Sequence, residues 1–455
     1  MGLSLLDELR EPLGSTGLLE GGDVPDGGYR FGRPLAIARP KTTSEVSAIL
    51  RLCHAARQPV VAWGGKTGLV AGANATGAIA LSLERMNRIE EIDADAATMM
   101  VEAGCILSNV CDTAEAAGLF FPLDLGARGS ATIGGNISTN AGGNRVIRYG
   151  MMRDLVLGLE AVLADGTILS SLNHLVKNNA GYDLKQLFIG SEGTLGVVTR
   201  AVLRLRPKPK SQQVALLAVA SFAQLPRLLR SLEAGLAGTL SAFEVMWHDF
   251  YELVTTPPAQ GKKPLPAGYP YYVLVEALGG DQAEDDARFE RVLGAELESG
   301  TVADATIAKS RSECNRIWAL RDDVLQVGRN APIFTFDVSL GIGEMDAYIA
   351  DVAGALRSRW PKMTMMVFGH LGDGNLHVIP GVGDGSLAAR RAVEEIVYGA
   401  LRERGGSVSA EHGIGLEKRE YLDFSRNPTE VALMRSLKRA LDPAGILNPG
   451  KIFAP

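Results

Sequence analysis

Six glycines lie between residues 126 and 143, in a stretch otherwise rich in small hydroxyl and amide side chains. Glycine loses more backbone entropy on folding than any other residue, so this density costs stability unless the backbone must approach something closely. Ile133, Ile137 and the apolar run Leu155–Leu163 that follows argue against a flexible linker. The stretch therefore predicts close contact between bare backbone and a large polar ligand.

A second glycine cluster, Gly64–Leu69, follows a short buried strand predicted at Pro59–Trp63. Such a loop can bring backbone N–H groups against a phosphate, although a glycine-rich turn without a ligand explains it equally well. Val60 stands where a Walker A loop needs its first glycine, and no Gly-x-Gly-x-x-Gly follows the strand. A P-loop nucleotidase and a Rossmann dehydrogenase are therefore both disfavoured.

Periodicity and turn signals predict regular elements around these loops. In the first half we expect a helix capped by Thr43 or Ser44 and ending near Arg57, strands Ile79–Leu83, Ile89–Asp93 and Thr98–Ala103, and a helix Ser108–Ala117. After the basic, proline-broken segment 204–210, strands alternate with amphipathic helices. Strands with helices on one face predict an α+β domain there.

The whole-chain composition excludes several classes of protein. With 46 Lys and Arg against 52 Asp and Glu in 455 residues, the net charge of −6 argues against general binding to nucleic acid or anionic membranes. No apolar run reaches the ~18 residues of a membrane span, and Met1–Arg10 is acidic, so we expect a cytoplasmic protein. The four cysteines show no Cys-x-x-Cys spacing and are interpreted as reduced core residues.

Half of the six histidines fall within two short motifs. Asp373-Gly374 is a two-residue hairpin signal, and that turn would place His370 directly opposite His377. Directly opposed residues have Cβ atoms about 4.5–5.5 Å apart, which suits two nitrogens about 2.0–2.1 Å from one metal ion. A plain turn with two surface histidines is the alternative.

A third metal ligand is expected in the segment 407–415, where Glu411 and His412 are adjacent. Neighbours on a strand point to opposite faces, so only one of the two can easily bind the same ion. Two histidines and one carboxylate leave coordination positions open, as a catalytic site requires.

Several motifs together resemble the FAD-linked oxidase family of vanillyl-alcohol-oxidase type. They are the loop from Trp63 to Leu69 and the segments Pro122–Gly150, Gly181–Gly196 and Asn448–Lys451. The match is closest to the branch of D-2-hydroxyglutarate and D-lactate dehydrogenases and the glycolate oxidase large subunit, and it extends from Arg33 to Phe453.

This resemblance implies an α+β fold in which a two-part FAD-binding domain precedes an α+β substrate domain and a C-terminal helical cap. We expect a lead-in at 1–32, the FAD-binding domain at 33–210, the substrate domain with the metal hairpin at 211–385, and the cap returning to the flavin at 386–455. FAD would be bound by residues from all the motifs: Gly64, Gly65, Lys66, Thr67, Gly68, Leu69, Pro122, Ser130, Thr132, Gly135, Asn136, Asn140, Gly142, Gly143, Glu192, Gly193, Gly196, Val198 and Asn448. Members with covalent flavin commonly carry histidine where this chain has Lys66, so non-covalent FAD is expected.

The resemblance also assigns chemical roles. His370, His377 and Glu411 would bind one divalent ion, zinc or manganese, and His412 would take the hydroxyl proton of a 2-hydroxy acid as its C2 hydride passes to flavin N5. A histidine near its ordinary pKa of about 6.5 suits this role. Arg321 would bind the substrate carboxylate, although a solvated arginine on a helix face is its plain alternative.

Partners and alternatives complete the prediction. The electrons would pass to an electron-transfer flavoprotein, a quinone or a cytochrome, and the chain could form a homodimer. A non-haem iron oxygenase would use the same two histidines and carboxylate but would leave the glycine loops without a role. A non-catalytic flavin-binding subunit is the other alternative, and the complete set of candidate catalytic residues argues against it.

Three positions depart from the D-2-hydroxyglutarate pattern: Thr335 replaces a lysine, Leu325 a threonine and Ile379 an asparagine. Without that lysine, the second carboxylate of D-2-hydroxyglutarate would be buried with no cationic partner, and burying an unpaired charge costs free energy. The sequence therefore favours D-lactate or another apolar monocarboxylate over D-2-hydroxyglutarate.

Overall fold

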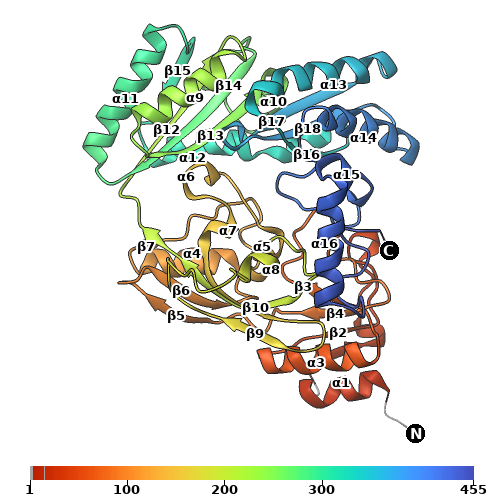
Figure 1. Cartoon of the computed structure of the whole chain (residues 1–455). Helices are drawn as coiled ribbons and strands as arrows, with labels where there is room; N and C mark the ends of the chain where they lie inside the picture. The colour runs from red at the N-terminus through yellow and green to blue at the C-terminus, as the bar shows by residue number, and fades with distance from the viewer. Residues whose placement is uncertain (1–3, 15, 455) are drawn as a thin grey trace. The chain divides into compact units, whose positions relative to one another are not determined.

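The computed structural model describes residues 4–14 and 16–454, so residues 1–3 and 15 of the predicted lead-in lie outside the described part. The chain divides into two compact units (Figure 1). Unit 1 contains the chain up to Gly143 together with 150–208 and 411–455, and unit 2 contains 144–149 and 209–410. Each unit is therefore built from segments that are distant in sequence.

Unit 1 contains three sheets (Figure 1). One is four-stranded, with the order β1 (Leu18–Glu20), β2 (Ala36–Ala38), β4 (Ile79–Ser82), β3 (Val60–Trp63), and β4 is parallel to both of its neighbours. The second is antiparallel, with the order β5 (Ile89–Asp93), β6 (Thr98–Glu102), β10 (Val197–Arg204), β8 (Val156–Val162), β9 (Ile168–Ser171). The third pairs β7 (Leu119–Phe120) with β11 (Arg206–Pro207).

The helices of unit 1 begin inside the predicted lead-in. Helix α1 (Leu5–Leu13) starts with a capping box between Ser4 and Asp7 and buries Leu9 completely. Helix α3 (Thr43–Ala55) is capped by Thr42, one residue before the predicted cap, because the Thr42 hydroxyl accepts the N–H of Glu45. The other helices are α2 (Gly28–Phe31), α4 (Leu107–Ala116), α5 (Ile133–Thr139), α7 (Met152–Leu155), α8 (Lys185–Phe188), α15 (Leu422–Ser425) and α16 (Pro428–Leu441).

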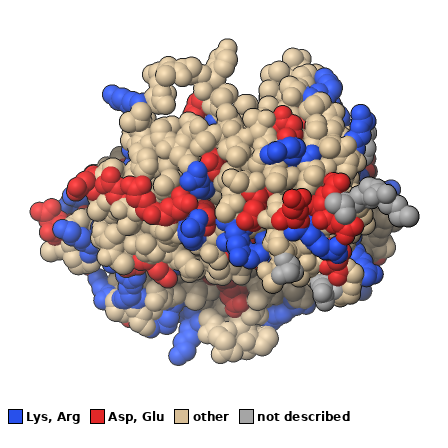
Figure 2. Space-filling view, turned by 90° about the horizontal axis from the view of Figure 1, so that it is seen from below, with Lys and Arg blue, Asp and Glu red and all other residues tan. Residues whose placement is uncertain are grey.

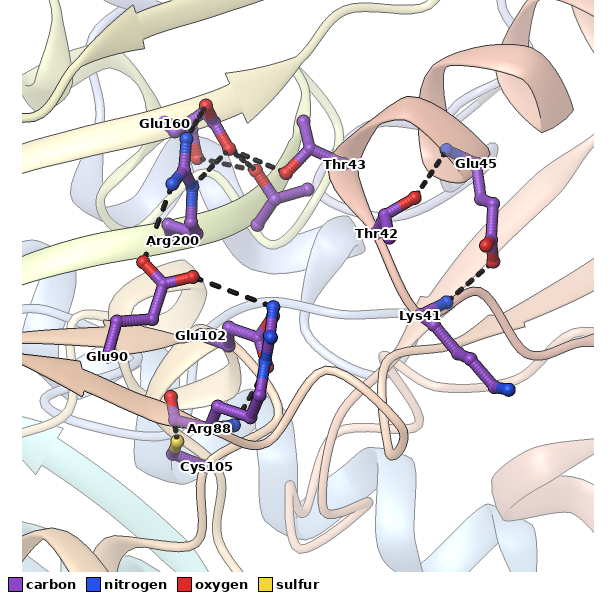
Figure 3. A network of polar contacts seen from close by, with 11 residues as sticks. Lys41, Thr42, Thr43, Glu45, Arg88, Glu90, Glu102, Cys105, Glu160 and Arg200 are labelled. Atoms are coloured by element: carbon purple, nitrogen blue, oxygen red, sulfur yellow. Dashed lines mark hydrogen bonds and ion pairs between the residues drawn. The ribbon is translucent and has the colours of Figure 1, made fainter.

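A chain of charged side chains crosses the five-stranded sheet (Figure 3). Glu160 on β8 accepts two hydrogen bonds from Arg200 on β10, at 2.9 and 2.7 Å. Arg200 also reaches Glu90 at 3.4 Å, and Arg88 reaches Glu102 at 2.9 Å. Because Glu160 and Glu102 are almost fully buried, the pairing offsets the cost of removing their charges from water.

Unit 2 is organised on one antiparallel sheet of seven strands (Figure 1). Its order is β15 (Asp304–Ile307), β12 (Ser211–Val219), β14 (Tyr271–Gly279), β13 (Leu240–Trp247), β17 (Thr364–Gly369), β18 (Asn375–Gly381), β16 (Phe336–Ser339). Its helices are α6 (Val146–Tyr149), α9 (Gln224–Gly235), α10 (His248–Thr255), α11 (Gln282–Glu298), α12 (Arg311–Asp322), α13 (Met345–Arg359) and α14 (Leu387–Arg402).

The prediction of helices on only one face of this sheet is wrong. On β12, Leu216 and Ala218 pack into a core that includes Ile317 of α12, and Leu217, which points to the opposite face, is equally buried. The strand is covered on both sides, so its apolar run is continuous rather than alternating. The α+β class itself is confirmed.

Lysine and arginine lie interspersed with aspartate and glutamate on the face shown in Figure 2. That mixture agrees with the small net charge of −6. Within residues 4–14 and 16–454, no helix is long and apolar enough to cross a membrane.

Candidate functional site

The two glycine-rich segments of unit 1 lie directly against each other. A Cβ atom at Gly65 would lie 1.9 Å from the Ser130 carbonyl oxygen, and one at Gly64 would lie 2.4 Å from the Thr132 hydroxyl. Gly65 is therefore required by a close approach of backbone to backbone, whereas Gly64 makes room for the Thr132 hydroxyl. Strand β3 thus delivers the first predicted FAD loop onto the second.

Part of the second segment is helical. Helix α5 begins just after Thr132, and Gly134 lets it approach β6, because a Cβ atom there would lie 2.7 Å from that of Ala103. Asn140 ends the helix in the left-handed conformation, and Gly143 follows with φ +115°. At the end of the helix, the N–H groups of Asn140 and Ala141 donate to the carbonyl oxygens of Ile137 and Asn136.

Three buried polar side-chain atoms in this region have no hydrogen-bond partner among the described residues: Thr132 Oγ1, Asn136 Nδ2 and Asn448 Oδ1. The residues are only 5–7 % exposed. Buried polar atoms are rarely left unsatisfied in native proteins, so three together point to a polar ligand. All three belong to the predicted FAD set, and the observation therefore fits that cofactor.

Lys66 turns back onto aromatic rings in the first loop. Its φ is +54°, and its Nζ lies 4.4 Å from the centre of the Trp63 ring and 5.6 Å from that of Phe31. Two further residues of the predicted set serve packing, since Val198 lies in the unit's core and a Cβ atom at Gly196 would lie 2.7 Å from the Phe188 ring.

Glu192 connects the predicted FAD set to the loop that carries Glu411 and His412. Its carboxylate accepts the N–H groups of Ile414 and Gly415 at 2.7 and 2.8 Å. A Cβ atom at Gly413 would lie 2.8 Å from the same carboxylate, so a glycine is needed there. Glu192 therefore fixes the backbone immediately after His412.

The strand argument for the Glu411 loop is wrong. Residues 410–412 form a bend, and no strand pairing occurs over 409–414, so alternation cannot separate the directions of Glu411 and His412. Instead, Glu411 Oε1 accepts the N–H of Gly143, which lies in the second glycine-rich segment, at 3.2 Å. The loop is held by polar contacts within unit 1.

The predicted hairpin register in unit 2 is also wrong. Phe368, not His370, is the cross-strand partner of His377, and the turn is lengthened by a 3₁₀ segment at Leu371–Asp373. Leu371 is completely buried, and burying it draws the turn into the core. The two histidines nevertheless remain neighbours, with ring centres 5.5 Å apart.

A buried carboxylate holds both His370 and Arg321. Glu244, on β13, accepts a hydrogen bond from His370 Nδ1 at 2.6 Å and one from Arg321 Nε at 2.8 Å. Burial alone would raise the pKa of Glu244, but His370 and Arg321 outweigh it and lower the pKa to about 2. Arg321 is itself 7 % exposed and is therefore not a solvated arginine on a helix face.

His370 and His377 each have a carboxylate beside them within unit 2. A histidine that gives its Nδ1 proton to a carboxylate presents Nε2 to an ion, as His370 would. His377 is the cross-strand partner of Asp337 in the pairing of β16 with β18, and the Asp337 carboxylate accepts a hydrogen bond from Asn375 at 2.7 Å. The full set of His370, His377 and Glu411 draws on both units and stays a prediction.

Comparisons with known proteins agree with the prediction of an FAD-binding protein. A family model described as "FAD binding domain" matches residues 34–171, and one described as "FAD linked oxidases, C-terminal domain" matches residues 208–452. The chain belongs to the FAD-linked oxidases.

Curated members of this family resemble the chain over nearly its whole length. "D-2-hydroxyglutarate dehydrogenase" of Xanthomonas citri pv. viticola is 42 % identical over 92 % of this chain and 89 % of its own length. The proteins of Bos taurus and Arabidopsis thaliana with the name "D-2-hydroxyglutarate dehydrogenase, mitochondrial" are 41 % and 40 % identical over 93 % and 91 % of this chain, and 77 % and 74 % of their own lengths.

Solved structures share the vanillyl-alcohol-oxidase-type fold at low identity. p-Cresol methylhydroxylase has a TM-score of 0.78 at 17 % identity, covering 99 % of this chain and 96 % of its own. 4-Ethylphenol oxidase from Gulosibacter chungangensis has a TM-score of 0.75 at 19 % identity, covering 99 % and 97 %. The predicted fold class is confirmed.

Proposed function

We propose that this protein is an FAD- and divalent-metal-dependent dehydrogenase that oxidises a D-2-hydroxy acid to the 2-oxo acid. The observation that carries the proposal is the contact in unit 2 between a buried arginine and a histidine, with Arg321 Nη2 3.0 Å from His370 Nε2. A guanidinium binds carboxylates, and an imidazole binds metals. Family membership and the names of the curated relatives support the same reaction class.

The roles of the chain's residues follow from the chemistry of a 2-hydroxy acid. His370, His377 and Glu411 would hold one zinc or manganese ion, which would lower the pKa of the bound hydroxyl, while non-covalent FAD would accept the hydride. His412 accepts the hydroxyl proton, and Glu192 supports the backbone after it.

Arg321 orients the substrate through its carboxylate. Because Nε is bound to Glu244 and Nη2 contacts His370 Nε2, Nη1 would bind the carboxylate first, and Nη2 would join it on leaving His370. Because the bound carboxylate fixes the orientation of the substrate, less entropy is lost on reaching the transition state, and the activation free energy of hydride transfer is lower.

Within this class, we propose D-lactate or another apolar monocarboxylate as the substrate. Ile379 supports a monocarboxylate, since it is 6 % exposed and packs with Met366 and Phe368 in the core of unit 2. D-2-hydroxyglutarate is the second candidate, because it is named in the curated relatives. We also propose that the electron acceptor is an electron-transfer flavoprotein, a quinone or a cytochrome. The protein would form a homodimer and would be located in the cytoplasm.

Anaerobic mixing of the purified, metal-loaded protein with a D-2-hydroxy acid tests the proposal directly. We expect a yellow protein whose flavin absorbance bleaches with the D but not the L isomer. A colourless protein, or a flavin that no 2-hydroxy acid reduces, would refute it.

A further inference from the structure

Glu244 is an ionisable side chain in unit 2 to which the proposed reaction assigns no role. It lies on β13 with 1 % of its residue surface exposed. Each of its carboxylate oxygens has a different partner: Oε1 accepts from His370 Nδ1, and Oε2 accepts from Arg321 Nε. One buried group thus holds the proposed metal ligand and the proposed substrate-binding cation.

These contacts define which nitrogen of His370 carries its proton. A carboxylate paired with a guanidinium accepts hydrogen bonds and has none to donate, so the proton of neutral His370 lies on Nδ1. Nε2 then carries the lone pair, and Arg321 Nη2 donates to it at 3.0 Å. At each of the three hydrogen bonds that join these side chains, a donor therefore faces an acceptor.

We infer that Glu244 is a positioning residue that prepares His370 for the metal ion and Arg321 for the substrate carboxylate. This inference rests on the proposed function. By fixing the Nδ1–H tautomer, Glu244 presents Nε2 of His370 as a ligand, and by holding Nε of Arg321 it fixes the orientation of the guanidinium.

The same geometry creates a competition between a metal ion and Arg321. Both use the Nε2 lone pair of His370, so a cation binds there only after Arg321 Nη2 has moved off it. Removing Glu244 and removing Arg321 therefore have opposite effects on metal affinity. A general loss of packing would instead lower the affinity in both variants.

The experiment starts from FAD-loaded protein from which the metal has been removed. Its affinity for zinc is then measured by competition with a chromophoric chelator. Glu244→Gln keeps the shape but replaces one acceptor by a donor, so it leaves one of the two N–H groups unmatched. We expect a 10- to 100-fold weaker affinity, the usual effect of removing such a supporting group. Arg321→Met, which removes the competitor, should bind zinc at least as tightly as the wild type.

Two further variants separate positioning from stability. Glu252→Gln changes a partly exposed carboxylate of the same unit, paired with Lys263, and should leave zinc affinity unchanged. Glu244→Asp keeps the charge but draws the carboxylate back, and we expect partial rescue relative to Glu244→Gln. Circular dichroism and the flavin-to-protein absorbance ratio check that every variant is folded.

Each outcome supports or overturns the inference. Glu244→Gln with zinc affinity within threefold of the wild type overturns it, as does a weakened Arg321→Met. If Glu244→Gln does not fold, the comparison of Glu244→Asp with Arg321→Met decides in the same way. A wild type that binds no zinc refutes the metal site of the proposed function itself.

Discussion

Acid stability of unit 1 should depend on Glu160, whose carboxylate joins three elements (Figure 3). Besides Arg200, it accepts the hydroxyls of Thr43 and Thr199 at 2.6 and 2.8 Å. Burial alone would raise the pKa of Glu160, but Arg200 and the two hydroxyls together lower it to about 2. Protonation is therefore much harder in the folded protein than in the unfolded chain.

The size of the effect follows from that pKa. The difference from the ordinary value of 4.5 is ~2.5 units, or ~3.4 kcal/mol at 1.36 kcal/mol per unit. Because the Arg200 side chain is 30 % exposed, water screens part of the attraction, and we expect about 2 kcal/mol. The lowered pKa means that this stabilisation is complete above pH 4.5 and is lost as the pH falls from 4.5 towards 2.

Glu160→Gln should therefore lower the free energy of unfolding by about 2 kcal/mol at pH 7, and the gap to the wild type should shrink by about 1 kcal/mol at pH 3.5. Urea unfolding, followed by circular dichroism and by the flavin fluorescence released from unit 1, measures both values. Glu84→Gln is the matched control, because Glu84 pairs with Arg39 at 3.4 Å and is 56 % exposed. The predicted role of Glu160 would be refuted by a difference in unfolding free energy between variant and wild type that is equal at both pH values. A difference no larger than that of Glu84→Gln would also refute it.

Four further predictions concern the reaction. Chelator treatment should abolish turnover while FAD stays bound, and full activity in demonstrably metal-free protein would contradict the metal role. His412→Ala should lower kcat by about 10²–10⁴ with its metal content intact, whereas loss of stoichiometric metal would show that the roles of His412 and Glu411 are exchanged. Gly413→Ala should retain FAD but lower kcat at least tenfold, because its Cβ meets the Glu192 carboxylate at 2.8 Å, and an unchanged kcat would show that this contact does not position the loop. Finally, kcat/KM with an artificial electron acceptor should favour D-lactate or D-2-hydroxyisovalerate over D-2-hydroxyglutarate, and a clear preference for the dicarboxylate would reveal a cation that compensates for Thr335.

Elements with a strong local signal were predicted nearly to the residue. The apolar run Leu155–Leu163 became β8, and the periodic pattern beginning at Thr43 became α3, with its cap displaced by one residue. β8 is buried along its whole length and α3 buries one face at helical spacing, so in both cases neighbouring residues contain the information needed. The glycine segments were expected to approach a polar ligand; the structure shows that Gly64 and Gly65 lie against Thr132 and Ser130 of the second segment, and contact with a ligand stays a prediction.

The hairpin register failed for a reason that lies outside the turn. Asp373-Gly374 is a valid turn signal, but burial of Leu371 competes with the two-residue loop, and the longer connection results. A local pattern cannot weigh that competition, because the core that receives Leu371 is assembled from other strands. The Glu411 loop failed similarly, since its shape depends on Gly143 and Glu192, far away in the sequence.

Glu244 shows why the supporting groups of a site are the hardest part to predict. It lies on β13, where a glutamate between apolar residues is typical of a solvent-facing position. Its burial is tolerated because Arg321 neutralises its charge and His370 donates a second hydrogen bond, and these partners stand 77 and 126 residues further along the chain. Candidate metal ligands and bases could be recognised by residue type and local motif, whereas the carboxylate that orients them is distinguished only by its partners. The same holds for Glu192, whose contacts with the N–H groups of Ile414 and Gly415 span 222 and 223 residues. In each unit, therefore, a carboxylate contributed by a distant segment determines how a residue proposed for the reaction is presented.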